Sequence, residues 1–344
     1  MERSLFLIGA ILVGLTVLCS PVMGKGDLFP VLDSQIPPYS PQHRVSGKVE
    51  IVGSNTMKTI LESWKGKLGK IQPGLDLILE TGGSATGVES LINGKINIAA
   101  MSRPMTNEEI NAFALRIGYP PASVPVAVDA LAVFVHKDNP LDHITLQRLD
   151  ALFSSDRRRG APESLDQWGQ LGLSGVWANA PIHAQIRDAN SGTAQFFREF
   201  VLLGGKDKEP GMVQPGAASV VYAVTNDSYA IGYSGIGYRT NSVKPLRVAA
   251  IEGDPFVEPT FETATNGTYP LRRLLYLYVN QSPNTKPSPV LSEIIKFAVS
   301  LEGQQLVSMA GFFPLPTKEL LASSTAWSSP LASAGPNEES QDLK

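Results

Sequence analysis

Short apolar runs alternate with amphipathic stretches along this chain, and this alternation constrains the fold more than any other feature. The predicted strands cover residues 48–52, 75–80, 96–100, 130–136, 182–186, 229–234, 246–251 and 274–280. The predicted helices begin near Thr56 and cover residues 145–153, 194–203, 217–226 and 290–310. Strands and helices in this order predict an α/β fold with a mostly parallel sheet covered on both faces. Ligands of such sheets bind beyond the carboxyl ends of the strands, where helix N-termini point.

The first segment of the chain has the pattern of an export signal. Residues 1–24 form the predicted signal peptide, with a charged start, an apolar run and a cleavage position near Gly24. An uncleaved membrane anchor is the alternative, but spanning a bilayer usually takes roughly 20 apolar residues. Lipid attachment at Cys19 is disfavoured because Leu18 stands where lipoprotein processing prefers a small residue. We therefore expect a periplasmic protein whose mature chain, having lost its single cysteine, forms no disulfide.

Composition separates the body of the chain from its two ends. Residues 25–46 are proline-rich and predict a linker or a surface arm, whereas the small, acidic tail at 321–344 predicts disorder. A chain of 344 residues that is 43% hydrophobic and 18% charged is long enough for two globular domains. Its formal net charge of −3 creates no field that would attract nucleic acid. A bound anion must therefore be held by local geometry.

Three predicted helices begin directly after strands with turns rich in hydroxyls and glycine, at residues 54–56, 82–87 and 191–193. Each turn exposes unpaired N–H groups at the positive end of a helix, and glycine lets an anion approach the backbone. Ordinary capping is the alternative, worth about 1 kcal/mol per cap. A cap needs only one hydroxyl, however, and these turns carry two or three. Arg187 precedes the third turn and adds a planar fork suited to an oxyanion.

Other chemistries lack their required residues. The four histidines show no metal-ligand spacing, and no histidine lies near Ser191 to activate it as a nucleophile. The turn before Lys58 lacks the glycine of a nucleotide-binding P-loop. We therefore expect no enzyme activity, no metal and no cofactor.

The order of the motifs GSNTM, GGSATG, MSRPMT, RDANSGT and YPLRRLLYLYVN resembles that in the phosphate-binding proteins of bacterial ABC phosphate-uptake systems. The resemblance covers residues 48–317. It implies a type II periplasmic-binding-protein fold, in which two α/β lobes joined by two hinge crossings close on a desolvated phosphate. It also implies a monomer that delivers the ion to a permease in the inner membrane. We expect lobe I at residues 47–127 with 246–320, and lobe II at 128–245.

The resemblance further implies that the three turns donate hydrogen bonds to the ion from hydroxyls, main-chain amides and one guanidinium. The donors implied in this way are Thr56, Met57, Ser84, Arg187, Ser191, Gly192 and Thr193.

Two positions depart from the family pattern. Arg103 stands where well-studied members carry an aspartate that accepts the ligand proton and excludes sulfate. We expect Arg103 to donate to a ligand oxygen, so that its replacement by alanine weakens binding by about tenfold or more. The alternative is an ion pair with Glu108 or Glu109. Ala189 replaces an acidic residue that orients the arginine, and Asp188 is a poor substitute because adjacent strand residues face opposite sides.

The predicted function is therefore that of an exported solute-binding protein for inorganic phosphate. Without the family aspartate, another tetrahedral oxyanion such as sulfate or molybdate is an alternative ligand. A phosphate sensor or surface adhesin is a second alternative, for which the N-terminal arm and the tail leave room. An exported phosphate-ester hydrolase is a third, but it needs a nucleophile with its base or a metal cluster.

Overall fold

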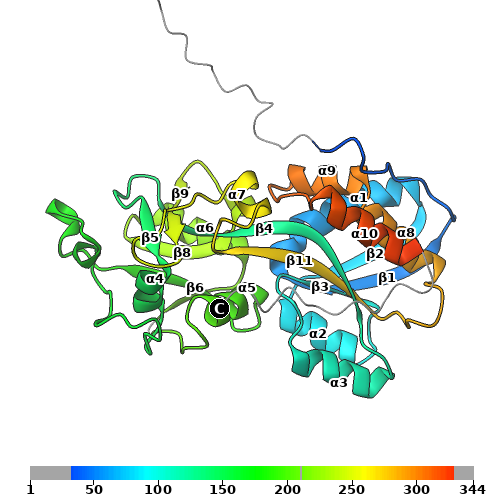
Figure 1. Ribbon diagram of the computed structural model, residues 1–344, viewed down its shortest axis with the longest axis horizontal. Helices are drawn as coiled ribbons and strands as arrows, with labels where there is room; N and C mark the ends of the chain where they lie inside the picture. Colours follow the sequence, from blue (N-terminus) through cyan, green and yellow to red (C-terminus); the bar gives the residue numbers. More distant parts are fainter. Residues whose placement is uncertain (1–31, 210, 329–344) are drawn as a thin grey trace, which may run out of the picture.

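The computed structural model describes residues 32–209 and 211–328, so the predicted signal peptide lies outside the described residues. Figure 1 shows two lobes side by side, with the long strand β4 (Ala122–His136) and strand β11 (Arg272–Val279) running between them. These two antiparallel strands are the hinge crossings that the resemblance implies. The two-lobed α/β architecture is therefore confirmed.

The strands follow one another in an order that places the crossings at the centre. The path reads β2 (Gly74–Glu80), β1 (Ser46–Gly53), β3 (Ile98–Met101), β11, β4, β8 (Ala230–Gly235), β6 (His183–Arg187) and β7 (Met212–Gln214). Strand β9 (Val243–Pro245) pairs with β4. Pairing is parallel among β1, β2 and β3 and among β6, β7 and β8, but antiparallel at both crossings. Each lobe thus has a parallel set of strands whose carboxyl ends face the other lobe, which is where ligands of such sheets bind.

Helices cover the strands of both lobes (Figure 1). Lobe I carries α1 (Lys58–Ile71), α2 (Ser84–Ile92), α3 (Asn107–Ile117), α8 (Pro289–Ala298), α9 (Leu301–Met309) and α10 (Thr317–Ser328). Lobe II carries α4 (Leu146–Phe153), α5 (Gly192–Phe200), α6 (Ala217–Asn226) and α7 (Phe261–Thr265). Short 3-10 helices include η2 (Asn55–Met57), η3 (Trp168–Leu171), η4 (Gly175–Trp177) and η5 (Ile236–Tyr238). The spacing of Met57, Ile60, Leu61, Trp64 and Leu68 predicts one apolar face for the first helix, and these residues are buried. Among the described helices, none is both long and apolar enough to cross a bilayer.

Two predictions near the C-terminus were wrong. The single helix predicted at 290–310 is two helices, because Ser300 accepts a hydrogen bond from the Gly303 amide and caps α9. A Cβ at Gly303 would lie 2.0 Å from the Phe297 carbonyl oxygen, so the break depends on close backbone packing. The tail predicted to be disordered from residue 321 is helical as far as Ser328, and its Trp327 is buried. Residues 329–344 lie outside the described residues.

The lobe boundary predicted at residue 246 lies too early. Strand β10 (Arg247–Ala249) pairs with β5 (His143–Thr145), which belongs to lobe II. Tyr269 donates a hydrogen bond from its hydroxyl to the Leu131 carbonyl at 2.9 Å. The chain therefore remains in lobe II after residue 246 and returns to lobe I along β11.

The proline-rich segment packs against lobe I as an arm wherever it is described. Glu293 of α8 is fully buried, and its carboxylate accepts hydrogen bonds from the Tyr39 hydroxyl at 2.6 Å and the Gln42 amide at 3.0 Å. Burial raises the pKa of Tyr39 well above its ordinary value, so the phenol stays protonated and keeps donating. Of the two possibilities considered for this segment, the structure therefore shows the surface arm.

Candidate functional site

The three hydroxyl-rich turns meet in the cleft between the lobes. The Thr56 and Thr193 hydroxyl oxygens lie 2.9 Å apart, although they belong to different lobes. The second turn touches the third through the Ala85 amide, which donates to the Asn190 carbonyl at 3.3 Å. It touches the first through the Gly83 amide, which donates to the Gly53 carbonyl at 2.8 Å. We call these turns (residues 53–57, 83–87 and 187–193), together with Arg273, the anion clamp.

Two of these turns show ordinary helix capping. Ser54 accepts a hydrogen bond from the Thr56 amide at 3.1 Å, and Ser191 accepts from the Thr193 amide at 3.2 Å. Each serine uses its oxygen in this way and keeps its hydroxyl proton for another acceptor. The Met57 amide also has a partner, the Ser54 carbonyl at 3.2 Å. The two main-chain amides that the resemblance implies in the first turn are thus already bonded within the turn.

Arg187 supplies buried donors that have no partner among the described residues. It is the last residue of β6, and it is only 3% exposed. Its Nε and Nη1 atoms are buried without a hydrogen bond. Burial, and to a smaller extent the positive charge of Arg273, lower the pKa of Arg187 to about 10, so the guanidinium stays charged at neutral pH. Such N–H groups are costly to leave unpaired, and an oxyanion would satisfy them.

A second buried arginine, which sequence reasoning missed, lies beside the first. Arg273 of β11 donates from Nη2 to the Thr193 hydroxyl at 3.0 Å, while its Nη1 is buried without a partner among the described residues. The same side chain pairs with Asp129 of β4, which is fully buried and directly opposite in register. Its guanidinium carbon also lies 5.6 Å from the centroid of the Phe196 ring. Arg273 therefore reaches the clamp from a hinge crossing.

Asp188 does not compensate for the missing acidic residue at position 189. Its carboxylate accepts from the Asn190 amide at 2.8 Å, and the side chain is exposed. No salt bridge joins Asp188 to Arg187 in the described part of the chain. Asp188 lies just past the end of β6, and its carboxylate is used within the turn that follows.

Arg103 lies at the edge of the clamp, and most of its donors are already occupied. Its Nη1 and Nη2 atoms bond both carboxylate oxygens of Glu109, at 2.7 and 2.6 Å. Its Nε donates to Gln195 of lobe II at 2.5 Å. Pairing with Glu109 is the alternative that the sequence left open, and the structure shows that pairing. Ser84 lies nearby, with its hydroxyl oxygen 3.4 Å from that of Ser102.

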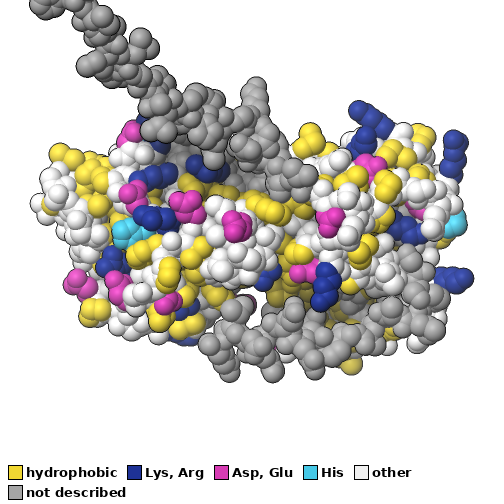
Figure 2. All heavy atoms as spheres, turned by 45° about the horizontal axis from the view of Figure 1, so that its top comes forward, with side chains coloured by type: hydrophobic (Ala, Val, Ile, Leu, Met, Phe, Trp, Pro, Cys, Tyr) yellow, Lys and Arg dark blue, Asp and Glu magenta, His cyan; other side chains and the backbone are white. Residues whose placement is uncertain are grey.

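The charges around the clamp favour an anion only locally. On the face drawn in Figure 2, acidic and basic side chains are interspersed and form no large patch of one sign.

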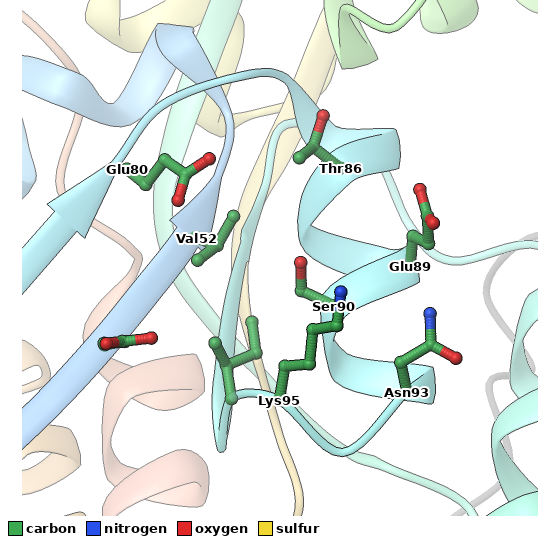
Figure 3. Close-up of a pocket in the computed structure, with 9 residues that line it drawn as sticks. Val52, Glu80, Thr86, Glu89, Ser90, Asn93 and Lys95 are labelled. Atoms are coloured by element: carbon green, nitrogen blue, oxygen red, sulfur yellow. The ribbon is translucent and has the colours of Figure 1, made fainter.

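A separate cavity of about 310 Å³ lies between β1, β2 and α2. Figure 3 shows the carboxylates of Glu80 and Glu89 among the residues that line this cavity. Glu50 also lines this cavity, so the cavity is mainly acidic and would repel an anion. Within residues 32–209 and 211–328, no three His, Cys, Asp or Glu side chains gather as metal ligands.

Comparison with known proteins agrees with this geometry. Residues 39–302 match the profile of the PBP superfamily domain. The chain is 42% identical over 296 residues to the phosphate-binding protein PstS of Pseudomonas aeruginosa, which covers 86% of this chain and 92% of that relative. It is 29% identical over 273 residues to the protein SphX of Synechococcus elongatus, covering 78% of each chain.

Solved structures share the fold. An ABC transporter substrate-binding protein from Clostridium perfringens, solved with bound phosphate, superposes with a TM-score of 0.65 at 25% identity. The match covers 78% of this chain and all of that one. PstS from Borrelia burgdorferi gives a TM-score of 0.53 at 25% identity, over 79% of this chain and all of that one. The chain therefore belongs to the PBP superfamily and, within it, to the family of the phosphate-binding proteins PstS.

Proposed function

We propose that this chain captures inorganic phosphate between its lobes and hands it to an ABC permease. The observation that carries the proposal is the convergence of two buried arginines, Arg187 and Arg273, whose free N–H groups share one cleft with the Thr56 and Thr193 hydroxyls. Charged donors that are shielded from water bind an oxyanion more strongly than exposed ones do. The names of the PstS relatives and the phosphate bound in the Clostridium structure support the same ligand.

The proposed clamp combines donors from both lobes and from the hinge. Its members are six of the residues expected from the sequence, namely Thr56, Ser84, Arg187, Ser191, Gly192 and Thr193, with Arg273 added. Met57 is left out because its amide already donates to the Ser54 carbonyl, and Arg103 because Glu109 and Gln195 occupy most of its donors. Because the lobes contribute separately, an ion bound to both sides stabilises the closed arrangement, and the closed arrangement removes water from the ion.

The rest of the proposal concerns the setting in which the protein works. We place lobe I at residues 47–127 with 272–320 and lobe II at 128–271, and we propose export by cleavage near Gly24, a periplasmic location and a monomeric state. The partner is the membrane permease of a phosphate uptake system, and no catalysis is assigned. Assays of phosphate-ester hydrolysis, with and without divalent metals, should show no turnover above background.

Titration calorimetry of the mature chain with inorganic phosphate tests the proposal. One ion should bind per chain, and Arg187→Gln should weaken the affinity by about a hundredfold, since charged hydrogen bonds contribute about 1.5–3 kcal/mol each. The exposed Arg239 of the same lobe provides the control, because Arg239→Gln removes a charge outside the clamp. Absence of phosphate binding by the wild-type chain would rule out the proposal.

Sulfate and other dianions are the second candidate ligands, and one observation favours them. The carboxylates around the clamp are already engaged, Asp129 by Arg273, Glu109 by Arg103 and Asp188 by a main-chain amide. None of these carboxylates is therefore free to accept a proton from the ligand. A free carboxylate of that kind would reject sulfate, which has the shape of phosphate but no proton to donate.

A further inference from the structure

Arg103 and Gln195 form a contact that spans the cleft beside the anion clamp. Arg103 follows β3 in lobe I, whereas Gln195 lies in the first turn of α5 in lobe II. The Arg103 Nε atom donates to the Gln195 side-chain oxygen at 2.5 Å. Because the two residues belong to different lobes, separation of the lobes would break this hydrogen bond.

Arg103 is held in place from its own lobe. Glu109 binds two of its nitrogens, and the Pro104 carbonyl accepts a third hydrogen bond at 2.7 Å. Glu109 is itself fixed by a capping box with Thr106 at the start of α3. Arg103 is only 4% exposed, so its side chain loses little further freedom when it meets the other lobe. Its charge is balanced by Glu109, so Arg103 offers little net attraction to an anion.

Gln195 is held in place from lobe II. Its side-chain nitrogen donates to the Ala189 carbonyl at 3.2 Å, which orients the amide oxygen toward Arg103. Ala189 belongs to the loop that carries Ser191, so the same side chain braces the third turn of the clamp. The contact thus joins two preorganised groups, one on each side of the cleft.

We infer that Arg103 and Gln195 act as an interlobe latch that prolongs the residence of the bound anion without contacting it. This inference rests on the proposed anion binding. An interaction present only in the closed state lowers the rate of opening and leaves the encounter of the ion with the open state unchanged. Arg103 is then a positioning residue that acts on closure. Well-studied family members carry an aspartate that contacts the ligand at the position of Arg103.

Stopped-flow measurement of phosphate association and release tests the latch. Gln195→Ala should release phosphate about tenfold faster, the effect of losing one charge-assisted hydrogen bond, while the association rate stays unchanged. Glu199→Ala is the matched control, because Glu199 lies one turn further along α5 and is exposed, with no hydrogen bond to lobe I among the described residues. The control should release phosphate at the wild-type rate.

A double-mutant cycle separates the latch from direct ligand contact. If Arg103 acts through Gln195, Arg103→Ala should accelerate release in the wild-type chain but add nothing in the Gln195→Ala background. Additional acceleration in that background, or an unchanged release rate in Gln195→Ala, would overturn the inference. Thermal unfolding of each variant identifies any loss of folding caused by the freed Glu109.

The two proposals fail separately. A wild-type chain that does not bind phosphate would contradict the proposed function, and with it the residence of a bound phosphate. A wild-type chain that binds phosphate, but releases it no more slowly than Gln195→Ala does, would reject the latch and leave the proposed function standing.

Discussion

Asp129 holds Arg273 across the two hinge strands through hydrogen bonds of 2.9 and 2.7 Å from Nε and Nη2 to one carboxylate oxygen. The other carboxylate oxygen accepts from the Ile236 amide of lobe II at 3.3 Å. Both side chains are buried, so neither charge is solvated. The pair leaves Nη1 of Arg273 without a partner among the described residues. Asp129 therefore orients the arginine, and the arginine retains one donor for the proposed anion.

Arg273→Gln should weaken phosphate binding by about tenfold to a hundredfold, because it removes one of two buried cations while it preserves much of the side-chain volume. Titration calorimetry measures this loss. Arg272→Gln is the matched control, since its side chain points to the opposite face of β11 and should leave the affinity unchanged.

Folding must be separated from binding in this test. Arg273→Gln leaves Asp129 buried without its charged partner, which costs about 3–5 kcal/mol of the free energy of unfolding. Adding Asp129→Asn should restore part of that stability, measured by denaturant unfolding, but none of the affinity. Recovery of phosphate affinity in the double variant would show that the positive charge is not what binds the ion.

The overall fold was accessible from the sequence because apolar periodicity reports directly on burial. The strands from β1 to β3 and the buried face of α1 lie where alternation and spacing predicted them. Helix ends and lobe boundaries that depend on tertiary packing could not be predicted from the sequence. The division between α8 and α9 depends on how closely Gly303 approaches Phe297, and the lobe boundary depends on the pairing of β10 with β5.

The residues of the candidate site could be predicted from the sequence only where its donors form local motifs. Hydroxyls and glycine at helix starts are adjacent in sequence, so their convergence in one cleft followed from the strand order. Asp129 and Arg273 are far apart in sequence and meet only through the register of β4 with β11. A signal was present nonetheless, because an acidic and a basic residue inside two apolar strands each need a buried partner.

Thr193→Val should reduce phosphate affinity by about tenfold, since its hydroxyl lies between Thr56 and Arg273 and a methyl group cannot replace either hydrogen bond. The β-branched shape is retained, so helix α5 should form as before. Thr225→Val on α6 is the control, because that threonine lies outside the clamp. Equal losses in the two variants, measured by calorimetry, would argue against a specific role of the Thr193 hydroxyl.

Phosphate affinity should rise with pH across neutrality, and sulfate should compete. Burial places the pKa of Arg187 at about 10, so the clamp itself keeps its charge between about pH 6 and about pH 8. The rise must therefore come from the ligand, whose dianion offers more acceptor oxygens to a site without a free carboxylate. Competition calorimetry at three pH values checks both statements. A flat profile with sulfate excluded would reveal a proton acceptor in the bound state.

Gly192→Ala should abolish tight phosphate binding while it leaves the chain folded. A Cβ at this position would lie 2.1 Å from the Ser84 hydroxyl oxygen and 2.7 Å from that of Ser102, and both serines belong to the opposite lobe. The clash arises only when the lobes meet, so the open arrangement can accommodate the methyl group and closure cannot. We expect a melting temperature close to that of the wild type in the absence of phosphate, and no increase when phosphate is added.

Gly216→Ala provides the comparison for this last variant. Gly216 caps α6 in the same lobe, and a Cβ there would lie 3.5 Å from the Ser219 hydroxyl oxygen, which is an ordinary contact. Phosphate should raise its melting temperature as it does for the wild type. If phosphate also protects Gly192→Ala, the ion binds without the close approach of Gly192 to Ser84, and lobe closure is not what holds it.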